Sequence, residues 1–519
     1  MTDSVMTRRG FVADAAKAAA AATAGTLAAP GLARAARKKP NILFIAVDDL
    51  NDWVGPLGGY PGVLTPNLDR LADKTRLFRR AYTPAPACSA ARSAVMFGVQ
   101  PYHSGVYTNY EQWQLGSRLI GQKSLPRLLK DEGYLTVGAG KLFHDGWRSA
   151  SQRPAANDPG AWSDYDFCVR DDKQCELSEA ELEDAVQFTE ELTFGKTSAR
   201  GSEMPDVASV KWFNKRVLQS RHDKPFFGAI GLRKPHGPFV VPRAYFDLYD
   251  EDSLRYPPGV LDPTHNTFAT NADVKDLPPA AIAMLKQFGE KDHKRIVGGG
   301  HWKEIVHAYL ATISFSDYCL GLILNAWLNG PNASNTVVVL WSDHGWQLGE
   351  KMGWRKFTLW ERATRVPFMV GGTFGDKEIR AGVEKAPTST IDIFPTVADI
   401  ALGGVPKASD LGELALDGRS LRKPLLDREK ASGPALSTWM LKTDDEGGEA
   451  RQRHFSVRTV NNRLIAYGNG DRELYDHTRD PYEFDNLLAK PTADALATAE
   501  RLAKFLPKRS ECVPRAKSA

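Results

Sequence analysis

A short segment with a cysteine and an arginine one helical turn apart is the part of this sequence best suited to chemistry. Pro84 and Pro86 favour an extended approach, because proline disfavours helix for the residue before it. Small, helix-tolerant residues follow from Ala90, and Gly98 is a stop signal. We therefore expect a short helix with Cys88 at its N-terminus, where unpaired backbone N–H groups favour an anion.

Arg92 lies four residues after Cys88 on the same face of this expected helix and can reach back toward it. A cysteine beside an anion site and a guanidinium is well placed for chemistry. Taken alone, the segment also fits a buried cysteine and a surface arginine on an ordinary helix. Its interpretation therefore depends on other groups in the chain.

Two continuous apolar runs, over 41–47 and 336–341, are typical of strands buried on both faces of a parallel sheet. The polar residues that follow these runs are Asp48, Asp49, Asp343 and His344. Sites in open α/β sheets form at the carboxyl ends of strands, so these carboxylates would meet and repel one another. A hard divalent cation with oxygen ligands removes that conflict. Acids that only cap the following turns, and a hydrogen-bonded histidine, are the alternative.

Further cationic or titratable residues fall at or after other expected strand ends. They are Lys141, His144, Lys234, His236 and Lys356. Each one singly also fits a surface lysine or a hydrogen-bonded histidine. Together they would surround a metal and an anion-binding helix terminus with cations. Such a set suits the cleavage of a sulfate or phosphate ester, in which charge develops on the transferred group and on the leaving oxygen.

The elements that must position these residues alternate between strands and helices, which predicts an α/β fold with a large, mainly parallel sheet flanked by helices. We expect a catalytic domain over residues 36–430 and a smaller antiparallel α+β domain over 431–519, where short alternating runs begin. An irregular polar insertion over about 145–205 contains an expected acidic helix near 177–192. A long loop region is expected from 238 to about 300.

The N-terminus predicts an export signal over residues 1–35. Arg8 and Arg9 precede a weakly apolar, alanine-rich run and a small-x-small cleavage site, which resembles a twin-arginine signal. The alternative is an alanine-rich helix with coincidental arginines. We expect the protein to be exported, to the periplasm or the extracellular space, without a stable membrane span. In that compartment Cys168 and Cys175 are close enough in sequence to bridge a loop.

The net charge of +4 over 519 residues argues against a nucleic-acid partner. Any attraction for acidic substrates must therefore be local. The segment 291–302 contains basic, histidine and tryptophan residues that fit either a subsite for an acidic chain or a solvated loop.

Several motifs in order along the chain resemble those of one enzyme family. They are Pro40-Asn-Ile-Leu-Phe-Ile-Ala-Val-Asp-Asp, Gly140-Lys-Leu-Phe-His, Lys234-Pro-His-Gly-Pro-Phe, Ser342-Asp-His-Gly-Trp-Gln-Leu-Gly-Glu and Thr390-Ile-Asp-Ile-Phe-Pro-Thr, followed by Glu473-Leu-Tyr-Asp-His-Thr-Arg-Asp-Pro-Tyr-Glu-Phe-Asp-Asn-Leu. With these motifs the chain resembles the type I sulfatases of the alkaline-phosphatase superfamily, in particular the iduronate-2-sulfatase-like branch. The expected activity is hydrolysis of a sulfate ester, on a sulfated sugar or glycan.

The resemblance implies that a maturation enzyme oxidises Cys88 to formylglycine, whose hydrate is the nucleophile. It also implies one calcium ion. The implied ligands of that ion are the modified residue 88, Asp48, Asp49, Asp343 and His344.

The resemblance also implies roles for the surrounding side chains. Arg92 would steady the hydrate, while Lys141, His236 and Lys356 would hold the sulfate oxygens. Either His236 or Lys356 would protonate the leaving alcohol. His144 would help to remove the proton of the second hydroxyl in the step that expels sulfate.

The sequence around Cys88 departs from the family signature, which is Cys-x-Pro-Ser-Arg, four residues, then Thr-Gly. This chain has Ala90 for proline, Ala91 for serine and Phe97 for threonine. Cys-x-Ala-x-Arg resembles the variant that the radical-type maturase accepts, so we still expect modification. Two other functions stay open: a phosphonate or phosphate monoester hydrolase of the same superfamily, and an unmatured, non-catalytic protein that binds sulfated glycans.

Overall fold

The centre of the molecule is a nine-stranded sheet in which eight strands follow the order β15-β2-β13-β10-β1-β8-β4-β5, with β14 paired to β13. The computed structural model describes residues 39–144, 156–166, 182–186, 188–261, 263–264, 267–268, 270–427, 430–441 and 453–517. The strands of this sheet are β1 (Asn41–Val47), β2 (Thr75–Phe78), β4 (Leu135–Gly140), β5 (Asp164–Asp166), β8 (Phe226–Leu232), β10 (Thr336–Ser342), β13 (Phe368–Phe374), β14 (Lys377–Glu378) and β15 (Gly382–Glu384). The expected export signal and the pair Cys168 and Cys175 lie outside the described residues.

Four neighbouring strands in the middle of the sheet, β10, β1, β8 and β4, run parallel. Their register places Val47 of β1 opposite Ser342 of β10 and Leu232 of β8. The polar residues that directly follow these strands therefore reach the same edge of the sheet. The next strand, β13, lies between β10 and β2 and is antiparallel to both.

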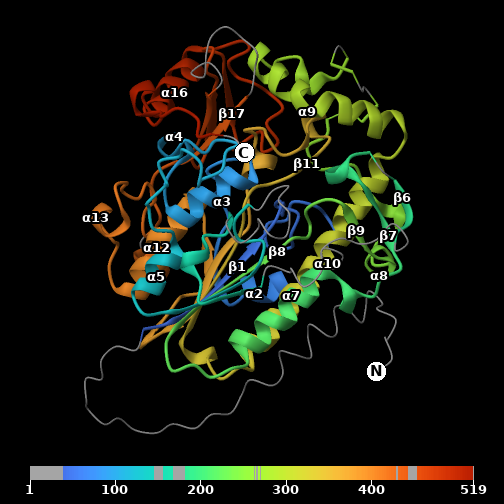
Figure 1. The fold of residues 1–519 in the computed structure, drawn as a ribbon. Coiled ribbons are helices and arrows are strands. Elements are labelled where there is room, and N and C mark those ends of the chain that lie inside the picture. The colour runs from blue at the N-terminus through green and yellow to red at the C-terminus, as the bar shows by residue number, and fades with distance from the viewer. Residues whose placement is uncertain are drawn as a thin grey trace.

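Helices cover both faces of the central sheet (Figure 1), and alternate residues of β1 pack into two separate hydrophobic cores. One set, which includes Phe44, packs into a core with α3 (Cys88–Phe97), α5 (Leu125–Asp131) and α12 (Ile393–Leu402). The other set, which includes Ile45, packs into a second core with α2 (Pro66–Ala72), α7 (Pro205–Phe213) and α10 (Trp302–Leu328). The predicted α/β architecture with a mainly parallel sheet is confirmed.

The C-terminal part forms a four-stranded antiparallel sheet, as its short alternating runs predicted. Its elements are β17 (Ala435–Met440), β18 (Arg453–Arg458), β19 (Asn462–Ala466), β20 (Arg472–Asp476) and α16 (Ala493–Ala503). A small core of residues from β18, β19, β20 and α16 joins the sheet to its helix.

Two local predictions were wrong. The described part of the expected acidic helix contains β6 (Leu182–Val186) instead, because β6 pairs with β7 (Phe194–Thr197) and β7 pairs with β9 (Phe239–Pro242). This pairing overrides the local preference of the acidic residues. The expected long loop before residue 300 contains a helix, α9 (Pro279–Gly298). The charged run 290–295 interrupts the apolar pattern of this helix in the sequence. At Gly289 a Cβ would lie 3.0 Å from the Met352 carbonyl oxygen, so the absence of a side chain there allows close packing.

The helix α10 lies against the sheet as part of the second core. Its Asp317 carboxylate accepts hydrogen bonds from the backbone N–H groups of Asn67 and Leu68, at 3.0 and 2.8 Å, and so caps α2. Within the described ranges, no helix combines the length and the apolar character that a membrane crossing requires.

The backbones of β4 and β8 approach most closely where Lys141 leaves the sheet. A Cβ on Gly231 would lie 1.8 Å from the Lys141 carbonyl oxygen. We expect Gly231→Ala to lower the free energy of unfolding by about 3 kcal/mol, because backbone must move to relieve the clash. Chemical denaturation measures this change. Gly298→Ala is the control, since a Cβ there meets no atom within 4 Å, and equal stability of the two variants would contradict the close approach.

Candidate active site

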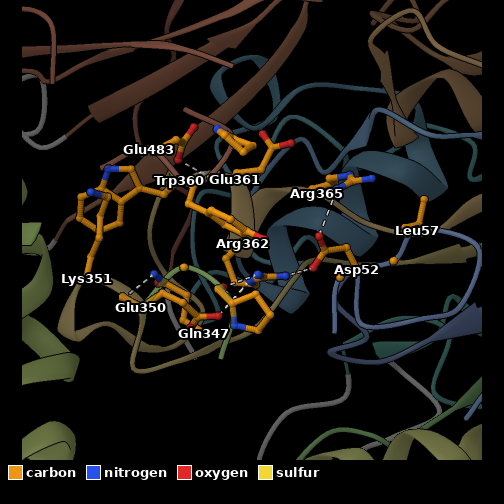
Figure 2. Close-up of a pocket in the computed structure, with 16 residues that line it drawn as sticks. Asp52, Leu57, Gln347, Glu350, Lys351, Trp360, Glu361, Arg362, Arg365 and Glu483 are labelled. Carbon is orange, nitrogen blue, oxygen red and sulfur yellow. Dashed lines mark hydrogen bonds and ion pairs between the residues drawn. The ribbon is translucent and has the colours of Figure 1, made fainter. Parts of the chain in front are cut away.

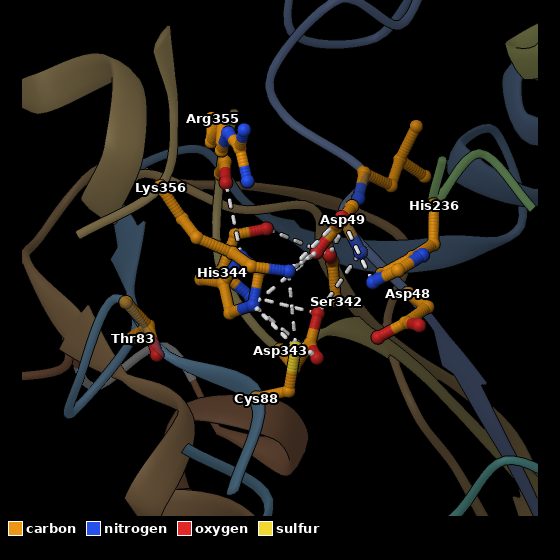
Figure 3. A network of polar contacts seen from close by, with 12 residues as sticks. Asp48, Asp49, Thr83, Cys88, His236, Ser342, Asp343, His344, Arg355 and Lys356 are labelled. Carbon is orange, nitrogen blue, oxygen red and sulfur yellow. Dashed lines mark hydrogen bonds and ion pairs between the residues drawn. The ribbon is translucent and has the colours of Figure 1, made fainter. Parts of the chain in front are cut away.

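Four of the five predicted metal ligands meet beyond the ends of β1 and β10 (Figure 3). Asp49, Cys88, Asp343 and His344 each offer one ligand atom, and these atoms all lie within 4.8 Å of one another. All four side chains are buried. Cys88 Sγ lies 3.2 Å from His344 Nε2, and the backbone N–H of Asp49 donates to Asp343 Oδ1 at 3.1 Å. We call this set the carboxylate–cysteine cluster.

Asp48, the fifth predicted ligand, lies beside this cluster and binds cations of the protein. Arg92 Nη2 donates to Asp48 Oδ1 at 2.8 Å, and Lys141 Nζ pairs with Asp48 Oδ2. Burial raises the pKa of Asp48, but Lys141 and Arg92 outweigh burial and hold it well below its ordinary value. Asp48 is therefore a permanent anion that orients both cations.

Arg92 is fully buried and holds three parts of the site together. Besides Asp48, it binds Asp343 Oδ2 through Nε at 2.9 Å. Its Nη1 donates to the carbonyl oxygens of Lys141 and Leu142 at 2.6 and 3.1 Å. Arg92 thus links α3 to the ends of β1, β10 and β4.

Cys88 is the first residue of α3, which ends at Gly98 as predicted, in the left-handed region at φ 69°. Its side chain is buried, and burial by itself raises the pKa of a thiol. Lys141, Lys356 and His344 reverse that effect, and a side-chain hydrogen bond with His144 adds to theirs, so the pKa of Cys88 lies well below its ordinary value. Position 88 therefore favours negative charge, as a site for an anion requires.

Lys356 reaches into the carboxylate–cysteine cluster from a segment with a strained backbone. Its Nζ lies 3.1 Å from Asp49 Oδ1 and 3.3 Å from Cys88 Sγ. Four non-glycine residues around it have positive φ angles, namely Lys351, Met352, Arg355 and Phe357. Each such conformation costs about 1–3 kcal/mol and persists where the surrounding structure enforces it. Lys356 therefore enters the cluster from a backbone segment that its surroundings hold in place.

The structure places Lys234 and His236, the predicted residues of the Lys-Pro-His motif, in different surroundings. His236 Nε2 lies 3.7 Å from Asp49 Oδ2, and its side chain is 23% exposed, so it borders the cluster on the solvent side. Lys234 instead directs Nζ to the carbonyl oxygens of His236 and Pro238. It therefore shapes the loop, while His236 faces the site.

A segment at the C-terminus holds the start of α3, and its role was not predicted from the sequence. Ala87 provides no side-chain cap for this helix. Instead, Ser89 makes two hydrogen bonds to the loop at 109–111. Its backbone N–H donates to Asn109 Oδ1 at 2.9 Å, and its hydroxyl donates to the carbonyl oxygen of Glu111 at 3.0 Å. The buried Glu111 carboxylate accepts from Arg515 Nε at 2.7 Å. We call residues 513–517 the C-terminal strap. Arg515 and Glu111 are 404 residues apart, so no local pattern in the sequence indicates this contact.

A second polar region surrounds a cavity of about 140 Å³ beside the site (Figure 2). Arg365 Nη1 binds Asp52 Oδ2 at 3.1 Å, Arg362 pairs with the other oxygen, and Arg362 Nε lies 2.9 Å from Glu350 Oε1. These ion pairs tie the loop after β1 to the strained segment. The cavity thus belongs to the scaffold that supports Lys356.

The segment 291–302, for which a basic subsite and a solvated loop were both open, is for the most part the end of α9. His293 is buried against Trp302 and Trp354 and accepts the Trp354 indole N–H at 3.1 Å. Burial lowers the pKa of His293 to about 4, so the ring is neutral. His301 pairs with Glu304 at 2.7 Å. Neither histidine reaches the cluster.

Comparison with known families decides the class of this site. Residues 40–404 match the family described as Sulfatase, and residues 349–509 match the C-terminal part described as N-sulphoglucosamine sulphohydrolase. The chain belongs to the sulfatase family. Sulfatases are sulfuric ester hydrolases, so this sulfatase is an enzyme of that class.

Individual relatives agree with this assignment. This sulfatase is 32% identical over 462 residues to a sulfatase of Formosa agariphila, covering 86% of this chain and 83% of that protein. It is 26% identical to mouse iduronate 2-sulfatase, covering 76% and 75% of the two chains. Its fold matches the crystal structure of a phosphonate monoester hydrolase from Agrobacterium radiobacter, with a TM-score of 0.72, 20% identity and coverage of 90% and 94%.

The strap contact generates a prediction for this sulfatase. Arg515→Ala removes the partner of Glu111, so the loop that caps Ser89 loses its support and residue 88 shifts. We expect kcat for a sulfate ester to fall about tenfold with a smaller change in KM, since small displacements at a reacting centre are costly. Steady-state kinetics of the purified variant measures both constants.

Arg515→Lys should recover part of the lost kcat, and Arg509→Ala, at an exposed position nearby, should leave it unchanged. A fall in kcat only in proportion to the fraction unfolded, judged by the melting temperature, would contradict a positioning role.

Proposed function

We propose that this sulfatase hydrolyses sulfate esters of a sulfated sugar, using a formylglycine made from Cys88 and one bound calcium ion. The observation that carries the proposal is the position of Cys88 at the start of α3, within 3.3 Å of both His344 and Lys356. Membership of the sulfatase family supports it.

The residues of the carboxylate–cysteine cluster fit a divalent cation. Asp49 and Asp343 are buried carboxylates that lie close together, and His344 adds a nitrogen. Calcium prefers oxygen ligands, so an oxygen in place of the Cys88 sulfur improves the donor set. The ion would be held by Asp49, Asp343, His344 and residue 88, with Asp48 next to them. It would supply positive charge that stabilises oxygens bound to it.

A hydrated formylglycine at position 88 supplies a nucleophilic hydroxyl for attack on sulfur and a second hydroxyl through which sulfate can later be expelled. Arg92 keeps residue 88 aligned with the carboxylates because it links α3 to Asp48 and Asp343. Lys141 and Lys356 place ammonium groups around position 88, where the negative sulfate oxygens must lie. These fixed cations stabilise charge as it develops in the transition state.

Histidines near residue 88 are our candidates for the two proton transfers of the reaction. His236 lies on the solvent side of the cluster, from which the alcohol leaves, so it or Lys356 would protonate the leaving oxygen. His144 hydrogen-bonds the side chain of residue 88 and would accept the proton of the second hydroxyl. Both are groups suited to general acid–base catalysis.

The substrate class and the cellular setting are further parts of the proposal. The similarity to mouse iduronate 2-sulfatase supports a sulfated sugar as substrate. A maturation enzyme that acts on the Cys-Ser-Ala-Ala-Arg segment is a required partner. The arginine pair near the N-terminus supports export to the periplasm or the extracellular space.

The chemical state of residue 88 tests the mechanism. We expect mass spectrometry of the proteolytic peptide that contains residue 88 to find formylglycine aldehyde or hydrate in protein from its native host. Only the unmodified thiol, in a host that matures other sulfatases, would contradict catalysis and favour a glycan-binding function. Release of sulfate from sulfated sugars, with slower release of product from a phosphonate monoester, distinguishes the sulfatase from the alternative hydrolase.

Removal of the metal tests the calcium site. Treatment with a chelator should abolish hydrolysis of 4-nitrophenyl sulfate, and added Ca²⁺ should restore it. Asp343→Asn should raise the Ca²⁺ concentration for half-maximal activity at least tenfold, because one negative ligand is lost. Full activity in the chelated protein, with metal content verified by elemental analysis, would contradict the proposal.

A further inference from the structure

A carboxylate from the insertion faces the cations that border the sulfate-binding site. Glu191 Oε1 lies 3.6 Å from Lys356 Nζ and 3.9 Å from His236 Nε2. Its side chain is only 17% exposed. Glu191 follows β6, in the segment for which the sequence predicted a helix. It is therefore an anion placed where substrate anions bind, and the proposed mechanism gives it no role.

Arg355 holds Glu191 in this position, and other side chains in turn hold Arg355. Arg355 Nη1 binds Glu191 Oε2 at 3.2 Å, and Arg355 Nη2 donates to Thr189 Oγ1 at 3.1 Å. Asp292 of α9 fixes the same guanidinium at 2.7 and 3.2 Å. Burial opposes ionisation of Glu191, but Lys356, His236 and Arg355 lower its pKa to about 2. The carboxylate stays ionised throughout the neutral range.

We propose that Glu191 sets the charge of the oxyanion that the site accepts, and that it selects singly charged sulfate esters against doubly charged phosphate monoesters. This inference rests on the proposed function, because it assigns a specificity-determining residue to the same site.

The basis of the selection is electrostatic. A sulfate ester carries one negative charge, whereas a phosphate monoester above its second pKa of about 6 carries two. An anion held by Lys356 lies within a few ångströms of Glu191, where the surroundings screen charge less than bulk water does. The repulsion therefore counts once against the sulfate ester and twice against the phosphate monoester. Inorganic sulfate is also a dianion, so the same repulsion promotes release of the product.

Glu191→Gln tests this role, since glutamine keeps an acceptor for Arg355 and removes only the charge. At pH 8, we expect the kcat/KM ratio of 4-nitrophenyl phosphate to 4-nitrophenyl sulfate to rise about tenfold, as one charge–charge repulsion at this range predicts. Inorganic phosphate and sulfate are dianions at this pH, so their inhibition constants should fall by about the square of that factor, roughly 100-fold. Glu191→Asp, which keeps the charge, should preserve most of the discrimination.

Asp292→Asn is the matched control, because it removes an equal charge from the other side of Arg355. It should change the ratio less than twofold. The inference would be overturned if the phosphate-to-sulfate kcat/KM ratio of Glu191→Gln stayed within twofold of the wild-type ratio. It would also be overturned if Asp292→Asn changed that ratio equally. Calorimetric titration with inorganic phosphate measures the same change in anion affinity without turnover, so inactivity toward sulfate esters would count against the proposed function alone.

Discussion

Mutual repulsion between buried carboxylates is the constraint that organises this molecule. Asp48, Asp49 and Asp343 are all buried at adjoining strand ends. At about 4 Å and an effective dielectric near 20, two such charges repel by about 4 kcal/mol. Burial raises the pKa of Asp343 to about 7 even with Arg92 beside it. Each cation around the site offsets part of the repulsion between these carboxylates, and a bound divalent ion would offset the remainder.

Two kinds of backbone bring the charged side chains of the site together: regular strands and a strained segment. The parallel strands β1 and β10 bring the acids together through their register, which needs no special backbone. The segment around Lys356 lacks such support, and it reaches the cluster only through several left-handed residues. The ion pairs that line the neighbouring cavity hold this segment. The position of Lys356 thus depends on charge pairs that lie outside the carboxylate–cysteine cluster.

The sequence predicted the features that local patterns encode. The apolar runs before Asp48 and Asp343 are buried strands, as predicted, and Gly98 ends α3. The ion pairs of Asp48 with Arg92 and Lys141 could not be predicted, because they depend on side-chain geometry.

Features that depend on distant pairing escaped prediction for a related reason. Glu191 follows β6, which pairs with β7, and β7 in turn pairs with the distant strand β9. Asp292 lies on α9, in the region that the sequence analysis assigned to a loop. Neither residue belongs to a motif that resembles the family, yet both contact Arg355 at the edge of the site.

The C-terminal strap also imposes an order of events on the newly made chain. Arg515 follows Glu111 by 404 residues. At about 5–20 residues per second, the ribosome adds Arg515 roughly 20–80 s after Glu111. During this interval the segment around Cys88 exists without the contact that later locks it. The architecture therefore leaves a period in which this segment lacks its final support, and docking of the strap ends that period.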